Sequence, residues 1–206
     1  MTHRRLALLS VSDKRGIESL GRGLVDLGFA ILSTGGTARA LRAAGVPIVQ
    51  VADHTGAPEV MDGRVKTLHP VIHGGLLARE TDEHLADLER LGGELIDLVA
   101  VNLYPFERTA ARPKVALAEL VEQIDIGGPC LLRAAAKNHE RVTVICEPRD
   151  YENVLWHLAR EREVAAAMRY ELALKAFRHT AAYDAAITRE LERFDPATGK
   201  RRGGER

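Results

Sequence analysis

Four polar side chains that can exchange protons or stabilise charge stand in short segments of unusual composition. Two are lysines, one is a tyrosine and one is a carboxylate, and groups of these kinds act as general acids, general bases and electrostatic partners of a reacting molecule. The set favours acid–base chemistry on a small phosphorylated molecule over nucleophilic or metal catalysis. The four residues are Lys66, Tyr104, Asp125 and Lys137.

A Gly-Gly-Thr segment predicts a phosphate site. Thr34-Gly-Gly-Thr37 follows an apolar run and opens a predicted helix. Glycine lets the backbone approach a ligand closely, and the first N–H groups of a helix attract anions. Ser12-Asp-Lys14, after the first apolar run, adds a hydroxyl and a positive charge. The spacing differs from a Walker A loop, and a simple tight turn is the alternative interpretation.

Each candidate also has a purely structural interpretation. Arg64 and Lys66 could form an exposed basic loop, and Tyr104 could be a packing corner before a proline. Asp125 stands just before a Gly-Gly pair, where a carboxylate often caps a helix. Lys137 ends the same predicted helix, where its charge complements the helix dipole.

Two histidines have a spacing that metal ligands on a helix can have, but the sequence does not favour a metal site. His69 and His73 are four residues apart, as two ligands on a helix can be. No glutamate follows the first histidine as it does in zinc proteases, and Pro70 intervenes. No metal and no other cofactor are expected.

Short apolar runs alternate with helical patterns, as in a parallel α/β sheet. A continuously apolar run is typical of a strand buried on both faces. The runs cover residues 6–11, 29–32, 47–51, 96–101 and 141–146, and helical patterns cover residues 17–27, 38–44, 83–91, 117–124 and 127–137, with two more helices after residue 150. The sequence predicts a doubly wound, mostly parallel sheet of about five strands, in a three-layer, Rossmann-type α/β fold with C-terminal helices.

Residues 53–79 break the alternation and predict a long functional loop with at most short helices. The last helix is expected to carry Leu172, Ala176, Phe177 and Ala181 on one apolar side. Ligands of open parallel sheets bind beyond the carboxyl ends of the strands. All four candidate catalytic residues and the phosphate cradle are therefore expected at that one edge of the sheet.

The composition of the chain limits the classes of partner that it is expected to bind. The 206 residues include 29 basic and 29 acidic side chains, so the formal net charge is zero. A neutral chain has no overall field that attracts nucleic acid or an acidic membrane surface. No apolar stretch approaches the roughly 20 residues of a membrane span, and two isolated cysteines are typical of reduced thiols. The chain is predicted to be soluble and cytoplasmic, with no nucleic-acid or membrane partner.

Six segments stand in an order that is more specific than any one of them. They are Ser10-Val-Ser-Asp-Lys14, Ser33-Thr-Gly-Gly-Thr37, Gly63-Arg-Val-Lys-Thr-Leu-His-Pro70, Asn102-Leu-Tyr-Pro-Phe106, Gln123-Ile-Asp-Ile-Gly-Gly128 and Ala134-Ala-Ala-Lys-Asn-His139. With them, residues 6–194 strongly resemble the N-terminal cyclohydrolase domain of the bifunctional purine-biosynthesis enzymes. The resemblance implies the methylglyoxal-synthase-like variant of the doubly wound sheet. It also implies ring closure of 5-formamidoimidazole-4-carboxamide ribotide (FAICAR) to inosine monophosphate (IMP), without a cofactor.

The resemblance also implies a role for each matching residue. Lys66, Tyr104, Asp125 and Lys137 would be catalytic. The ribose phosphate would be bound by Ser12, Asp13, Lys14, Thr34, Gly35, Gly36 and Thr37. The remaining substrate-binding residues would be Arg64, Val65, Thr67, Val101, Asn102, Ile126, Gly127 and Gly128.

Residues 1–194 are expected to form one domain, followed by a flexible tail or linker over residues 195–206. The family's larger transformylase domain is not part of this sequence, so formyl transfer is not expected. A homodimer through the two C-terminal helices is one arrangement open to such a chain. Two rival functions share the fold: a methylglyoxal-synthase-like phosphate lyase and a non-catalytic nucleotide-sensing domain.

Overall fold

A five-stranded parallel sheet organises the part of the chain that the structure, a computed structural model, describes: residues 4–202, with Asp62 described by its backbone alone. The strand order is β3-β2-β1-β4-β5, and each neighbouring pair is parallel. The predicted α/β fold and strand number are confirmed. The strands are β1 (Leu6–Val11), β2 (Ala30–Ser33), β3 (Val49–Gln50), β4 (Leu98–Asn102) and β5 (Thr143–Ile145).

The strands form where continuous apolar runs can be buried on both faces. Leu6 to Leu9 of β1 and Leu98 to Val101 of β4 are at most 1% exposed. The third strand is shorter than the predicted 47–51, because a helix begins at Val51. This edge strand pairs with β2 only through Val49 and Gln50.

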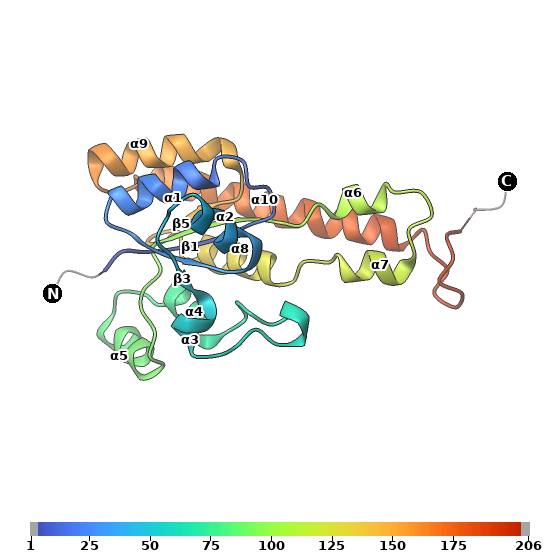
Figure 1. The fold of residues 1–206 in the computed structure, drawn as a ribbon, viewed down its shortest axis with the longest axis horizontal. Coiled ribbons are helices and arrows are strands. Elements are labelled where there is room, and N and C mark those ends of the chain that lie inside the picture. The colour runs from blue at the N-terminus through green and yellow to red at the C-terminus, as the bar shows by residue number, and fades with distance from the viewer. Residues whose placement is uncertain (1–3, 203–206) are drawn as a thin grey trace.

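Helices cover both faces of the sheet in three layers (Figure 1). On one face α1 and α9 lie side by side, and on the other α8 packs against β4 and β5. The longer helices are α1 (Ile17–Asp26), α2 (Gly35–Ala43), α4 (Pro70–Leu77), α5 (Asp82–Arg90), α8 (Gly127–Lys137), α9 (Tyr151–Glu161) and α10 (Ala166–Leu191). None of the helices in the described residues combines the length and apolar character that a membrane span needs.

The segment between β3 and α4 is irregular, as the sequence predicts for residues 53–79. It contains only α3 (Val51–Thr55) and the 3₁₀ turn η1 (Met61–Gly63) before α4 begins at Pro70. Proline suits this position because the first helical N–H has no partner inside the helix. His69 accepts a hydrogen bond from the Val71 N–H through Nδ1, at 3.2 Å, and so caps α4. This histidine has a structural role.

An arm extends from the sheet, built from α6 (Phe106–Ala110), α7 (Leu117–Glu122) and the far half of α10 (Figure 1). The 26 residues of α10 span about 39 Å, which is longer than the sheet edge they cross. A small second core fills the arm around Phe106, Leu120 and Phe194. The sequence did not predict α6 or this second core.

The expected apolar side of α10 differs from the structure at two of its four residues. Phe177 is 37% exposed and Ala181 is exposed, because the stripe of α10 that faces the sheet consists of Leu172, Ala173 and Ala176. Within the expected tail, Arg201 donates to the Ala110 carbonyl at 2.8 Å and pairs with Glu190. Residues 203–206 of the expected tail lie outside the described residues.

Arg141 ties three segments together at the amino edge of the sheet. Its side chain is 10% exposed and donates to the carbonyls of Gly75 (2.6 Å), Ile96 (3.1 Å) and Ala78 (3.2 Å). Asp97 lies 3.8 Å away and also accepts the Leu6 N–H at 2.7 Å. Burial lowers the pKa of Arg141, but its charge compensates carbonyls that α4 leaves without partners at its end.

We expect Arg141→Ala to lower the free energy of unfolding by about 3 kcal/mol, because the buried carbonyls of Gly75, Ile96 and Ala78 each lose a charged donor. Urea unfolding followed by circular dichroism measures this change. Arg90, whose only ion pair is exposed, is the matched control, and Arg90→Ala should cost less than about 1 kcal/mol. Equal effects of the two substitutions would contradict this assignment.

Candidate active site

Asn102, the last residue of β4, holds the loop that follows β1. Its Oδ1 accepts the N–H groups of Ser12 and Asp13 at 2.7 Å each, and its Nδ2 donates to the Asp13 carbonyl at 3.2 Å. These bonds occupy most of the side-chain amide that we expected to contact the substrate. Asn102 is therefore first a positioning residue for the β1 loop.

The start of α2 forms a cationic cradle. Thr34 stands in extended conformation before the helix, and Gly35 has φ +54°, a backbone conformation that favours glycine. A Cβ atom on Gly36 would lie 3.6 Å from both Lys14 Nζ and Arg39 Nη2. Partial burial and the charge of Arg39 both lower the pKa of Lys14. Two cations facing a helix N-terminus favour an anion between them.

Two of the predicted phosphate ligands serve other purposes. Thr37 is 3% exposed, and its hydroxyl accepts the Val11 N–H at 2.9 Å and donates to the Val11 carbonyl at 3.0 Å. It locks α2 onto β1, so its hydroxyl is not available to a ligand. The carboxylate of Asp13 is bound by Arg15, which lowers the pKa of Asp13.

Glu59 lies between the cradle and the loop that carries Lys66. Lys66 Nζ and Glu59 Oε2 lie 3.9 and 3.5 Å from the position that a Cβ on Gly63 would take. The same glutamate accepts a hydrogen bond from the Thr34 hydroxyl, through Oε1. A carboxylate that the sequence did not single out thus binds Thr34 of the predicted phosphate site and lies on the Lys66 side of the same region.

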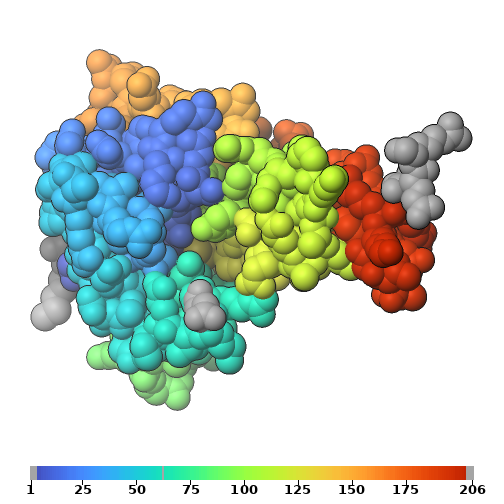
Figure 2. Space-filling model, turned by 45° about the vertical axis from the view of Figure 1, so that its right-hand side comes forward, coloured from blue at the N-terminus to red at the C-terminus, as the bar shows by residue number. Residues whose placement is uncertain are grey.

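Arg64 anchors the other side of this loop to α7. It forms a two-point ion pair with Glu122, which lowers the pKa of Glu122. Figure 2 shows this region from outside: the segment after β3, in teal, lies against the yellow-green arm, with the blue α1 region above. The loop is held between the arm and the sheet.

The start of α8 is packed so tightly that only glycine fits. A Cβ on Gly128 would lie 2.6 Å from Asp125 Oδ2, and one on Gly127 would lie 3.0 Å from the Thr67 hydroxyl. Asp125 Oδ1 accepts the Gly128 N–H at 2.8 Å, so the capping interpretation is correct. The second oxygen, Oδ2, does not take part in this cap. The Asp125 N–H itself donates to the Tyr183 hydroxyl at 2.9 Å.

The remaining predicted residues differ in what their side chains can reach. Tyr104 and Ile126 are 57% and 58% exposed, on segments that leave the carboxyl edge of the sheet. Val65 is 36% exposed and pairs with Val60 across an antiparallel bridge. Val101 is 1% exposed, so only its backbone could meet a ligand.

Lys137 does not lie with the others within one chain, and our expectation of a common edge is wrong for this residue. Helix α8 begins beside Asp125 and runs back across the sheet, so its last residue is about 15 Å from its first. The next residue, Asn138, donates to the carbonyls of Leu76 (2.8 Å) and Ala78 (2.9 Å), close to the Arg141 cluster. Lys137 is exposed near the opposite, amino edge.

Three residues of this region were missed by sequence reasoning. Arg39 lies one helical turn after Gly36, and that spacing could have indicated it. Glu59 and Tyr183 gave no local signal, because they approach Thr34 and Asp125 from segments 25 and 58 residues away.

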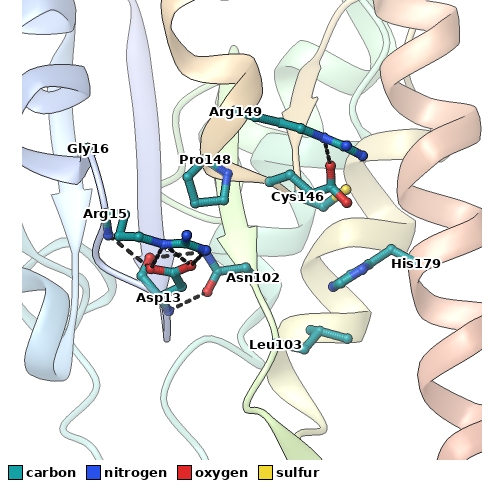
Figure 3. A pocket seen from close by; sticks show the side chains of 10 residues that line it. Asp13, Arg15, Gly16, Asn102, Leu103, Cys146, Pro148, Arg149 and His179 are labelled. Carbon is teal, nitrogen blue, oxygen red and sulfur yellow. Dashed lines mark hydrogen bonds and ion pairs between the residues drawn. The ribbon is translucent and has the colours of Figure 1, made fainter.

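A cleft of about 650 Å³ opens on the β5 side of the Asn102 loop (Figure 3). Its charges are paired within the protein: Asp13 with Arg15, and Glu147 with Arg149 and Lys175. Burial raises the pKa of the Cys146 thiol to about 11, so this thiol is a poor nucleophile near neutral pH. The lining residues are Asp13, Arg15, Gly16, Asn102, Leu103, Cys146, Glu147, Pro148, Arg149 and His179.

Side chains that could bind a metal ion are dispersed in the described residues. No three histidine, cysteine, aspartate or glutamate side chains there gather closely enough to hold a metal ion. The cationic cradle and the acid–base groups around Lys66 and Asp125 form the candidate active site.

We expect Gly36→Ala to weaken binding of ribose 5-phosphate at least about tenfold while leaving the fold intact. The added methyl group would meet Lys14 and Arg39 at ordinary contact distances but would fill the floor of the cradle. Isothermal titration calorimetry measures the affinity, thermal unfolding checks the fold, and ribose without phosphate serves as the ligand control. Unchanged affinity for ribose 5-phosphate would rule the cradle out.

Comparison with known proteins adds independent information. The family model of the MGS-like domain matches residues 16–130, and that of the AICARFT/IMPCHase bienzyme matches residues 135–203. Bifunctional purine biosynthesis proteins PurH from Halalkalibacterium halodurans and Sorangium cellulosum are 57% and 54% identical over 91% and 98% of this chain. The chain spans 37% and 38% of the length of these two curated relatives.

A solved structure extends the comparison to three dimensions. The structure described as the crystal structure of ForH superposes with a TM-score of 0.82 and 42% sequence identity, covering 92% of this chain and all of that one. The family-model match spans more than half of the chain, and the solved relative is matched over its full length. The chain therefore belongs to the family of MGS-like domains.

Proposed function

We propose that this chain is an IMP cyclohydrolase, which closes FAICAR to IMP with loss of water. The observation that carries the proposal is the position of a cationic phosphate cradle at the same edge of the sheet as Lys66 and Asp125. The close similarity to bifunctional purine biosynthesis proteins and the match to the AICARFT/IMPCHase model support the same activity. Formyl transfer is not proposed for this chain.

The cradle fixes one end of the substrate. The ribose phosphate binds at the start of α2, between Lys14 and Arg39, and accepts N–H groups that the helix leaves without partners. The imidazole ring then extends toward the second helix start, where Thr67 packs on Gly127 and Asp125 caps α8. Two helix N-termini and the Lys66 loop thus surround one ribotide.

The chemistry requires little beyond orientation and proton management. The carboxamide nitrogen attacks the formyl carbon, forming a C–N bond and an oxyanion on the former formyl oxygen. Lys66 stabilises this oxyanion together with N–H groups at the start of α8. Asp125 Oδ2 takes the proton from the nitrogen, and Tyr104 shapes the pocket. The proton held by Asp125 converts the oxyanion to a hydroxyl group. This hydroxyl takes a second proton, from Lys137, and leaves as water while the former formamido nitrogen loses its own proton and the C=N bond of the closed ring forms.

Orientation is expected to supply much of the rate enhancement. Both reacting groups belong to the same molecule, so the site has only to turn the formamido group toward the carboxamide. Effects of this kind reach about 7–11 kcal/mol in favourable cases. Asn102 contributes by fixing the Ser12–Asp13 backbone against which the ribotide lies.

An absorbance assay of FAICAR conversion tests the proposal directly. We expect IMP to form with folded protein alone, and chromatography against authentic IMP identifies the product. Binding of IMP without turnover would favour a nucleotide-sensing domain. Release of methylglyoxal from dihydroxyacetone phosphate would favour a phosphate lyase of the same fold.

Two substitutions test the assigned chemistry. Lys66→Ala should lower kcat about 10²–10³-fold, the usual effect of removing one oxyanion donor. Asp125→Asn should lower kcat about 10²–10⁴-fold, because the amide keeps an acceptor for the Gly128 N–H but cannot take a proton. Circular dichroism and unchanged thermal unfolding verify folding, and wild-type turnover in either variant removes that residue from the mechanism.

Lys137 needs a second copy of the chain to reach the site, and we propose that it acts across a homodimer. A two-fold axis through the middle of α8 would place the end of one helix beside the start of its partner's. The outward face there carries Arg133 and Lys137, with Phe177 and Tyr170 of α10 37% and 54% exposed. Arg133 lies 5.6 Å from the centre of the Phe177 ring. Exposed arginine and aromatic side chains are enriched at interfaces.

Mixing two inactive variants tests this arrangement. Lys66→Ala and Lys137→Ala should each be nearly inactive alone. A mixed dimer should have about half of the wild-type activity, since one of its two sites holds both lysines, so a 1:1 mixture after random exchange should recover about a quarter overall. Wild-type activity in Lys137→Ala alone, or no recovery after subunit exchange verified by mass spectrometry, would contradict the proposal.

The reaction is proposed to take place in the cytoplasm, without a nucleic-acid or membrane partner. The two free cysteines in the described residues, Cys130 and Cys146, are compatible with a reducing compartment. The balanced charge of the chain offers no broad basic surface to a polyanion.

A further inference from the structure

Glu59 places a negative charge at the cradle that is otherwise built for an anion. Its carboxylate accepts the hydroxyl of Thr34, the residue that precedes α2. On the other side it lies near the same Gly63 position as Lys66 Nζ. No group of the catalytic mechanism above requires a carboxylate here.

A carboxylate at this position imitates part of a bound phosphate. An acidic group near the start of a helix is stabilised by the helix dipole, as a phosphate would be. It also supplies the acceptor that Thr34 needs while no ligand is present. Because like charges repel, Glu59 and a phosphate dianion cannot both occupy this side of the cradle without cost.

The segment that carries Glu59 can give way at low cost. Glu59 is exposed and lies in the irregular stretch between α3 and η1. Its neighbours Val60 and Met61 are 42% and 71% exposed, so moving them uncovers little buried apolar surface. The same short segment leads through the Val60–Val65 bridge to Lys66.

We propose that Glu59 is a displaceable stand-in for the substrate's phosphate and thereby determines specificity for phosphorylated ligands. An entering phosphate monoester takes the Thr34 hydroxyl from Glu59, and the freed segment lets Lys66 adjust to the base. This inference rests on the proposed phosphate site, but not on the ring-closing chemistry. Glu59 acts through Thr34 and Lys66, and is a positioning residue.

Glu59→Gln removes the charge and keeps an acceptor for Thr34. We expect this variant to bind ribose 5-phosphate about threefold more tightly than wild type. A change of this size is typical of the interaction between two partly exposed charges. Binding of ribose should not change. In the ring-closure assay KM for FAICAR should fall about threefold while kcat stays near the wild-type value.

Calorimetric titration with ribose 5-phosphate and with ribose measures these affinities. Glu89→Gln, an equal change of charge on the exposed face of α5, controls for net charge and should leave both affinities unaltered. Glu59→Ala, which lacks the acceptor as well, should also tighten phosphate binding.

Unchanged or weaker ribose 5-phosphate binding by both Glu59 variants would overturn the inference, as would equal tightening by Glu89→Gln. A fall in kcat without any change in phosphate affinity would also overturn it, since that result assigns Glu59 to orienting Lys66 alone. Failure of the cyclohydrolase proposal would be visible separately, as absent ring closure with phosphate binding intact.

Discussion

The hydrogen bonds of Asn102 to the backbone of Ser12 and Asp13 are the constraint on which the site depends. In a sheet ordered β3-β2-β1-β4-β5, the chain passes outward in one direction from β1 and in the other from β4. The two strand ends therefore separate their loops, and a crevice forms between them. Asn102 bridges this crevice and fixes the positions of the two loops relative to each other. The cationic cradle lies on one side of it and the Cys146 cleft on the other.

The fold was predictable because its strands leave a strong signal. Runs such as Leu6–Val11 are apolar at every position but Ser10, since both faces of the strand are buried. The same reasoning failed for α10, whose apolar residues serve two cores in turn and so do not follow a single stripe. Helix α6 has only five residues, which is too few to show a period.

The candidate site was predictable only as far as local segments reach. Asp125 and Thr67 lie where the sequence indicated, because glycines next to them permit close packing at the start of α8. The structural role of Thr37 could not be predicted from the sequence, since its hydroxyl forms hydrogen bonds with the backbone of Val11 in β1. The position of Lys137, in contrast, could have been predicted from helix geometry. A helix that starts at the carboxyl edge must end at the opposite edge, and applying that geometry to residues 127–137 would have separated Lys137 from Asp125.

Tyr183 gives the arm a consequence beyond packing. Its ring contacts both hydrophobic cores and lies edge-on to Phe106, while its hydroxyl accepts the Asp125 N–H. Local opening of the arm would therefore remove a partner from the residue that caps α8. The fraction of time for which the site is intact then depends on the local unfolding equilibrium of the arm. Amide hydrogen exchange measures that equilibrium. In this chain the stability of the peripheral arm therefore limits how long the tightly packed start of α8 keeps its geometry.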